Sequence, residues 1–66
     1  MADRELDEKI LRILEVKGLT FRELLRSVPE ARPLSIKLAL DRLEKDGRVV
    51  RLVHDGKYIW TSRGER

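Results

Sequence analysis

The first part of the chain carries hydrophobic residues at the spacing that one face of an α-helix requires. The stripe consists of Leu6, Ile10, Ile13 and Leu14. It predicts a helix over residues 4–17, with Asp3 as its N-terminal cap and acidic residues in the first turns, where the helix dipole favours them. Gly18 follows directly, in an arrangement typical of the end of a helix.

A capping box marks the start of a second helix. Residues 20–23 read Thr-Phe-Arg-Glu, so the threonine side chain can accept from the glutamate N–H while the glutamate side chain accepts from the threonine N–H. Leu19 and Leu24 stand where a hydrophobic staple is expected. The prediction is a helix over residues 21–28, ended by Pro29, which disfavours helical backbone in the residue before it.

A third hydrophobic stripe predicts a helix over residues 33–46. Its members are Ile36, Ala39, Leu40 and Leu43. Pro33 suits the first position of a helix, where its missing N–H costs nothing, and Gly47 suits the position after the last. Leu34 and Leu38 stand two positions before and after Ile36, so they are expected on the side of the helix that faces away from the core.

After Gly47 the hydrophobic period shortens to two. Residues 48–54 and 57–61 are rich in β-branched and aromatic side chains, which predicts two strands. Asp55-Gly56 between them favours a two-residue type I′ turn, which needs positive φ at both positions. A turn of this length predicts the register: His54 faces Lys57, Val53 faces Tyr58, Leu52 faces Ile59, and Arg51 faces Trp60. The whole pattern predicts an α+β fold, three helices and then a two-stranded hairpin, in a single domain over residues 1–66.

The composition narrows the classes of protein. The chain has 66 residues, 41% of them hydrophobic, which suffices for one core but not for a large enclosed cavity as well. It contains no cysteine, which excludes disulfides and thiolate metal sites. No apolar run approaches the roughly 20 residues of a membrane span, and the N-terminus is too charged for a signal peptide. We therefore expect a cytoplasmic protein without a membrane partner.

The net charge of +3 comes entirely from the last third of the chain. Residues 1–47 contain ten Lys or Arg and ten Asp or Glu, whereas residues 48–66 contain five and two. A basic patch concentrated on one element is the usual footprint of a protein that binds a polyanion. A basic but merely solvated surface is the alternative.

Three segments resemble the winged helix-turn-helix superfamily. Residues 40–49, Leu-Asp-Arg-Leu-Glu-Lys-Asp-Gly-Arg-Val, are similar to its L-x-x-L-e-x-x-G-x-[IV] segment. Residues 19–24 resemble the [LI]-T-x-x-E-L that opens its second helix, and residues 58–64 resemble the Y-x-[LW]-T-x-x-G that leaves its hairpin. The resemblance covers nearly the whole chain, and the order of the segments is more specific than any one of them. It implies a third helix in the major groove of double-stranded DNA and a hairpin, the wing, at a neighbouring groove or at phosphates.

Carried over residue by residue, the resemblance implies a set of DNA-binding positions on the third helix and the wing. These are Arg32, Ser35, Lys37, Leu38, Arg42, Arg51, His54 and Lys57. Ser35 and Lys37 are expected at base edges or phosphates, and Arg32 and Arg42 at phosphates. Leucines at this face can contact thymine methyl groups.

These positions also have structural interpretations. Ser35 could help to cap the helix start, and the cations could be ordinary solvated side chains. Arg51 could lie over Trp60 as a packing or cation–π contact. We expect Trp60 itself to be an aromatic of the core or of the base of the wing. Asp41 could pair with Lys45 at i, i+4.

The outward leucines favour a second hypothesis, a winged helix that binds a protein partner. Leu34 and Leu38 form an i, i+4 pair of the kind that anchors a partner in a groove, and Asp41 on the same face would repel phosphate. Leu34 could instead pack on the turn before the helix. RNA binding is a third hypothesis, but the stacked sheet aromatics of RNA modules do not occur.

The sequence offers no set of residues for catalysis. His54 is the only histidine and stands beside a turn, no Cys/His set can hold zinc, and there is no glycine-rich phosphate loop. We therefore expect a small transcription regulator and not an enzyme, with no metal and no cofactor. In many dimeric relatives T-x-x-G begins a further helix, whereas this sequence stops at Arg66. A monomer, a homodimer through the first helix or the wing, and a part of a longer protein all stay open.

Overall fold

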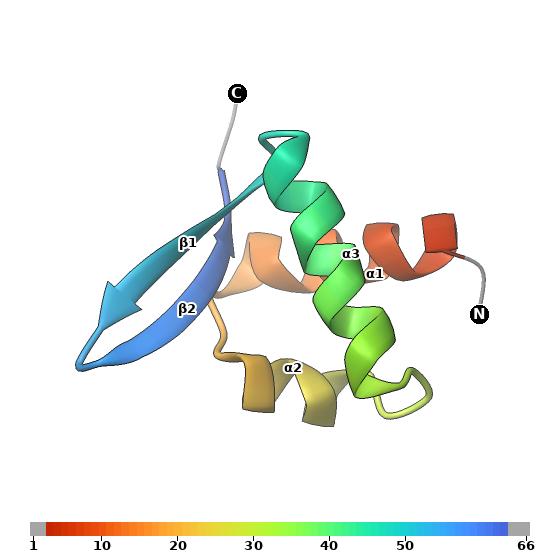
Figure 1. The fold of residues 1–66 in the computed structure, drawn as a ribbon, viewed down its shortest axis with the longest axis horizontal. Coiled ribbons are helices and arrows are strands. Elements are labelled where there is room, and N and C mark those ends of the chain that lie inside the picture. Colours follow the sequence, from red (N-terminus) through yellow and green to blue (C-terminus); the bar gives the residue numbers. More distant parts are fainter. Residues whose placement is uncertain (1–2, 64–66) are drawn as a thin grey trace.

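Three helices are followed by a two-stranded antiparallel hairpin in a computed structural model that describes residues 3–63 (Figure 1). The elements are α1 (Asp3–Val16), α2 (Phe21–Ser27), α3 (Pro33–Lys45), β1 (Val49–His54) and β2 (Lys57–Ser62). The predicted α+β arrangement is confirmed, and each predicted element is present with bounds that differ by no more than one residue at either end.

The helices form one body from which the hairpin extends to the side (Figure 1). α3 packs against both α1 and α2, and the hairpin packs against α1 and α3 through its base. In Figure 1 α3 crosses in front of α1, and α2 lies below both. Among residues 3–63, this arrangement leaves one long side of α3 without a neighbouring element, next to the hairpin.

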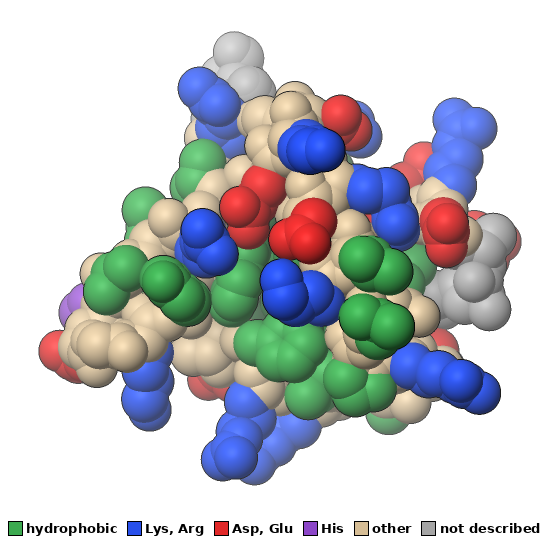
Figure 2. Space-filling model, viewed as in Figure 1, with side chains coloured by type: hydrophobic (Ala, Val, Ile, Leu, Met, Phe, Trp, Pro, Cys, Tyr) green, Lys and Arg blue, Asp and Glu red, His purple; other side chains and the backbone are tan. Residues whose placement is uncertain are grey.

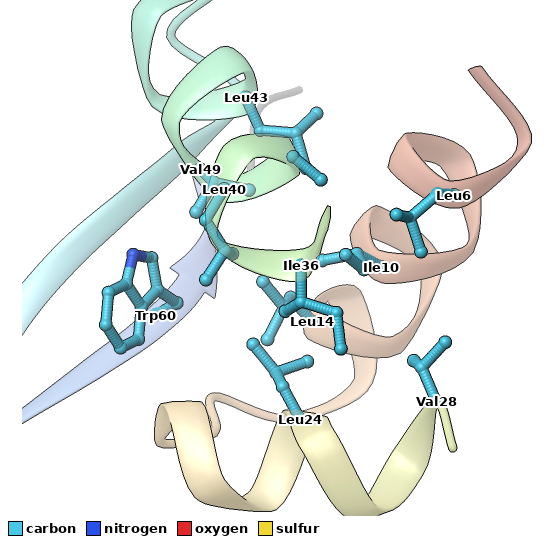
Figure 3. Close-up of a cluster of buried hydrophobic side chains, with 11 residues drawn as sticks. Leu6, Ile10, Leu14, Leu24, Val28, Ile36, Leu40, Leu43, Val49 and Trp60 are labelled. Carbon is cyan, nitrogen blue, oxygen red and sulfur yellow. The ribbon is translucent and has the colours of Figure 1, made fainter. Parts of the chain in front are cut away.

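The core is built from the stripes that the sequence predicts (Figure 3). α1 contributes Leu6, Ile10 and Leu14, while Ile13 packs against their edge and stays half-buried. The α3 stripe is buried in full, by Ile36, Ala39, Leu40 and Leu43. Leu24, Val28, Val49 and Trp60 complete the core. Because the core fixes the rotation of α3, it also decides which α3 side chains face outward.

Both ends of α1 differ in detail from the prediction. Asp3 is the first residue of the helix and not the cap before it. Gly18 follows the helix without the left-handed backbone that a glycine stop usually adopts, since only Gly47 and Gly56 have positive φ among the described glycines. A Cβ on Gly18 would lie 3.1 Å from Ile59 Cγ2, so this glycine lets the chain pass close to β2.

The capping box at α2 is present as predicted. The Thr20 N–H donates to Glu23 Oε1 at 2.9 Å, and the Glu23 N–H donates to Thr20 Oγ1 at 3.2 Å. The bond from the Thr20 N–H lowers the pKa of Glu23 because it stabilises the ionised carboxylate. The box thus satisfies N–H groups that the helix start would leave without partners.

The hairpin has the predicted register along its whole predicted length. His54 pairs with Lys57, and the ladder continues through Arg51 and Trp60 to Val49 and Ser62. Asp55 and Gly56 have φ values of 53° and 75°, as a type I′ turn requires. Gly47, with φ of 74°, ends α3 as predicted.

A contact that the sequence did not predict anchors the hairpin to the helices. Leu19, in the link between α1 and α2, forms a bridge with Trp60 of β2. The Leu19 N–H donates to the Trp60 carbonyl at 2.9 Å, and the Trp60 N–H donates to the Leu19 carbonyl at 2.8 Å. Lys9 of α1 pairs with Glu30 in the turn before α3, and its hydrogen bond lowers the pKa of the Glu30 carboxyl.

Candidate nucleic-acid interface

The N-terminal half of α3 exposes two leucines on its outward side. Leu34 is 68% exposed and Leu38 is 47% exposed, opposite the buried stripe that contains Ile36. Figure 2 shows hydrophobic side chains gathered over this half of α3 and on the hairpin, with Lys and Arg side chains among and around them. The prediction that both leucines point away from the core is confirmed. The interpretation in which Leu34 packs on the preceding turn does not fit this exposure.

Arg32 and Ser35 stand at the first turn of α3. Arg32 is the N-cap residue, and its exposed side chain makes no capping hydrogen bond. Ser35 is half-buried, whereas Arg32 and Leu34 beside it are exposed. The start of α3 therefore presents a cation to solvent next to Leu34.

Lys37 is exposed on the outward side of α3 and pairs with Asp41. Its Nζ lies 3.7 Å from Asp41 Oδ1, and both side chains are more than half exposed. The sequence suggested Lys45, one turn after Asp41, as the partner of this carboxylate. In the structure the partner is Lys37, one turn before it. Asp41 thus offsets the charge of the cation nearest to the centre of this face.

Arg42 faces α1 and not the outward side of α3. Its Nε and Nη2 atoms donate to the two carboxylate oxygens of Asp7 at 3.0 and 2.7 Å. This two-point hydrogen bond raises the pKa of Arg42 further above its usual value. The structure therefore gives Arg42 a role in joining α3 to α1, where the sequence predicted a phosphate contact or a solvated side chain.

Arg51 lies on the side of the hairpin that faces α3. The register places it opposite Trp60, but its guanidinium lies over the ring of Tyr58, 4.7 Å from the ring centroid. Trp60 is only 9% exposed, and its Nε1 donates to Glu44 Oε2 of α3 at 2.6 Å. The suggested cation–π contact thus exists with Tyr58 in place of Trp60, and Trp60 is an aromatic at the base of the hairpin.

His54 and Lys57 lie at the tip of the hairpin. They pair across the strands next to the turn and are both exposed. His54 Nε2 lies 3.5 Å from Asp55 Oδ2. Since side chains alternate along a strand, this pair lies on the opposite side of the hairpin from Arg51. The structure therefore brings Arg51 to the α3 side and leaves His54 and Lys57 at the tip and the far side.

Two further features of the structure were not named among the predicted site residues. Arg22 and Arg26 are exposed cations of α2, and their i, i+4 spacing opposite the core residue Leu24 was a usable signal for this exposure. The rings of Phe21, Trp60 and Tyr58 also form a row from α2 to the hairpin. No local pattern in the sequence indicates the row, because Phe21 is far from the other two rings along the chain.

The charges on this face are unevenly distributed. Arg32, Lys37 and Arg51 lie at the start and middle of α3 and on the hairpin, while Asp41 and Glu44 lie on the C-terminal half of α3. Figure 2 shows the acidic side chains over the upper half of α3. A polyanion would therefore be attracted to the N-terminal half of α3 and to the hairpin. The C-terminal half of α3 is mixed in charge, because its last turn carries Arg42 and Lys45 as well as Glu44.

No protein-family model, curated protein or solved structure matches this chain. Within residues 3–63, no group of three or more His, Cys, Asp or Glu side chains is placed to hold a metal ion. None of the helices in that part of the chain has the length and apolar character needed to cross a membrane.

Proposed function

We propose that the chain is a winged helix-turn-helix domain that binds double-stranded DNA, as a small transcription regulator. One observation carries the proposal: the free outward side of α3 and the α3-facing side of the hairpin lie on one face of the molecule (Figure 2). Exposed cations stand at both ends of that face, Arg32 at the start of α3 and Arg51 on the hairpin. In this proposal α3 enters the major groove and the hairpin is the wing.

The dimensions suit this mode of binding. α3 has 13 residues, which makes it about 20 Å long, and its outward side is free to enter a major groove about 12 Å wide. The hairpin extends to the side of the helical body that carries α3 (Figure 1). The wing can then reach the adjacent backbone or minor groove while α3 stays in the major groove.

The side chains of α3 divide between positioning and base contact. Arg32 would meet a phosphate at the start of the helix, and Lys37 a phosphate or a guanine edge. Leu38 would lie against a thymine methyl group. Ser35 contributes only if its half-buried hydroxyl reaches the groove. Arg42 is left out of the proposed interface, because its guanidinium is held by Asp7.

The wing supplies sequence-independent attraction. Arg51 would approach the backbone from the α3 side, while His54 and Lys57 at the tip would meet the neighbouring groove or its phosphates. Each phosphate neutralised by a cation releases counterions, so the affinity should fall steeply as salt is added.

The exposure of Leu34 and Leu38 favours a second candidate function. A winged helix could use this i, i+4 pair to dock on a protein partner, and Asp41 beside them would then no longer be unfavourable. Replacing both leucines with serine should abolish such binding. The fold should remain, because neither side chain belongs to the core.

The direct test is an NMR titration of the isotope-labelled chain with a short random-sequence duplex at two salt concentrations. DNA binding predicts shifts on residues 33–42 and 51–58 that fade at the higher salt, with a dissociation constant of roughly 10⁻⁴–10⁻⁶ M at physiological salt. No shift at low salt would overturn the proposal and leave the leucine pair as the site to examine.

A pair of double variants separates local contacts from net charge. Lys37→Ala with Arg51→Ala removes two cations of the proposed interface, and Arg4→Ala with Arg12→Ala removes two exposed cations of α1. The first pair should weaken duplex binding strongly and reduce the slope of log K against log salt by about two. The second pair should leave most of the binding intact. Equal losses would point to nonspecific attraction by the whole molecule.

A further inference from the structure

Three aromatic rings form a row that leads from the helical body to the wing. The centroids of Phe21 and Trp60 lie 6.3 Å apart with an interplanar angle of 56°. Those of Trp60 and Tyr58 lie 6.1 Å apart with an angle of 63°. Each separation is within the range in which tilted and edge-to-face pairs attract. The row fixes the position of the last ring, that of Tyr58, relative to α2.

Tyr58 is the most exposed ring of this row, since Phe21 is half-buried and Trp60 is buried. Trp60 is buried at 9% exposure, whereas Tyr58 is 53% exposed and Val53, directly across the hairpin, is 69% exposed. Trp60 is also held by its hydrogen bond to Glu44. Tyr58 is therefore an accessible ring on a rigid support, and the core does not need its outer surface.

Arg51 adds a planar cation to this ring. Its guanidinium carbon lies 4.7 Å from the Tyr58 centroid, and among the described residues Arg51 takes part in no ion pair. Nucleic-acid bases stack on aromatic rings and on guanidinium planes, and such stacking tolerates any base because every base has a π-face. Arg51 can also turn from the ring to a phosphate, which would uncover the ring for a base.

An intact duplex cannot occupy this platform. Its bases are stacked on both sides and show only their edges in the grooves, so a ring can stack only on a base that has lost its pairing partner or its neighbour. Such bases occur where a duplex ends in a single strand. The platform lies on the side of the wing that faces α3, as the hydrogen bond from Trp60 to Glu44 on the same side indicates.

We propose that Tyr58 and Arg51 form a stacking site for one unpaired base, so that the domain prefers duplex DNA with a single-stranded extension to blunt duplex DNA. The inference rests on the proposed duplex binding, which would place α3 on the paired part. It adds a feature of the DNA that α3 alone does not recognise.

The test measures fluorescence anisotropy of the whole chain with two labelled DNAs that carry equal numbers of phosphates, one blunt and one with a single-stranded extension. The wild type should prefer the extended DNA by about fivefold or more, as stacking of one base predicts. Tyr58→Leu should lose the preference and keep the affinity for blunt DNA, while Tyr58→Phe keeps both. Leu52→Ala, which alters an exposed side chain on the opposite side of the wing, should behave as the wild type.

A fluorescent base analogue, 2-aminopurine, at the first unpaired position gives a second readout. Stacking should change its fluorescence with the wild type and Tyr58→Phe but not with Tyr58→Leu, whose folding is checked by circular dichroism. Equal binding of both DNAs by the wild type would overturn this inference and leave the proposed function standing. Binding to neither DNA would overturn both.

Discussion

Gly18 and Gly56 favour glycine for two different reasons. A Cβ on Gly18 would lie 3.1 Å from Ile59 Cγ2 and 3.3 Å from Thr61 Cβ, closer than ordinary van der Waals contact. A Cβ on Gly56 would meet nothing within 4 Å, but the φ of 75° there belongs to the left-handed region. The limited space next to β2 favours glycine at position 18, and the left-handed backbone favours glycine at position 56.

Substitutions at the two glycines should therefore respond differently to the choice of residue. Gly18→Ala should lower the free energy of unfolding by about 1–3 kcal/mol through overpacking, and Gly18→Asn by at least as much. Gly56→Ala should cost about 1–2 kcal/mol, whereas Gly56→Asn should cost less because asparagine tolerates left-handed backbone. Urea denaturation of the four variants measures this. A Gly18→Asn variant more stable than Gly18→Ala would contradict the steric explanation.

Arg42 and Asp7 form the closest link between the side chains of α3 and α1. The pair has two hydrogen bonds, at 3.0 and 2.7 Å, and is partly exposed. We predict that Arg42→Ala and Asp7→Ala each lower the free energy of unfolding by about 1 kcal/mol. Because the two side chains act together, the double variant should be little worse than either single variant.

A double-mutant cycle from urea denaturation measures this coupling. Arg4→Ala with Glu8→Ala is a matched control, because that pair is highly exposed, with an N···O distance of 3.8 Å, and should show little coupling. An Arg42→Ala variant that keeps its stability but loses DNA affinity would return Arg42 to the interface that the sequence predicted.

The start of α2 depends on the charge of Glu23. Its pKa is lowered in the folded chain, chiefly because the Thr20 N–H donates to the carboxylate. A carboxyl whose pKa is lower in the folded state stabilises the fold above its unfolded pKa. That contribution is lost as the pH falls through the folded value. Acid should therefore remove the negative charge of the Glu23 carboxylate. The hydrogen bond from the Thr20 N–H can remain, because a protonated carboxyl still has an oxygen that accepts.

The prediction for this element is a stability difference that depends on pH. At neutral pH the wild type should melt at a higher temperature than Glu23→Gln, whose amide keeps an acceptor but lacks the charge. The difference should shrink as the pH falls below the unfolded pKa, about 4.3 for a glutamate. The pKa of Glu30 is lowered as well, so Glu30 also makes the stability of the wild type depend on pH. The difference in melting temperature between the wild type and Glu23→Gln isolates the contribution of Glu23. A difference that persists in acid would contradict the role of the charge.

Elements specified by local patterns could be predicted from the sequence, and links between distant residues could not. The capping box, the Asp55-Gly56 turn and the α3 stripe involve neighbours along the chain. The bridge between Leu19 and Trp60 joins residues that only the fold brings together. Arg51 could not be placed fully even within the hairpin. The predicted register gives Trp60 as its directly opposite neighbour. A long side chain also reaches the diagonal neighbour, which here is Tyr58.

At the scale of the whole molecule, the sequence showed which part of the chain holds the excess positive charge. It did not show on which side of the molecule each cation lies. The last third of the chain holds the net positive charge, and Arg51 and Lys57 are exposed there as expected. In the folded chain Arg51 and Lys57 lie on opposite sides of the hairpin. Arg42 contacts Asp7 of α1. The sequence pattern could not show these directions, because side-chain direction on a surface depends on which partners the tertiary structure supplies.

Asp41 is the residue at which the two candidate functions make opposite predictions. It lies on the outward side of α3, where it pairs with Lys37 at 3.7 Å. A phosphate that approaches Lys37 must compete with this carboxylate and is also repelled by it. Asp41→Asn removes both effects, while the helix loses only a surface pair worth a few tenths of a kcal/mol.

Under the DNA hypothesis, Asp41→Asn should therefore bind a short duplex more tightly, by about three- to fivefold at low salt, as expected for one like charge near a phosphate. The gain should fade as salt shortens the range of the repulsion. Glu15→Gln, an equal change of charge at an exposed position of α1, should produce a much smaller gain in the same anisotropy assay. Equal gains would mean that only the net charge matters. An unchanged affinity for Asp41→Asn would mean that DNA does not approach this side of α3, and would favour a protein partner at Leu34 and Leu38.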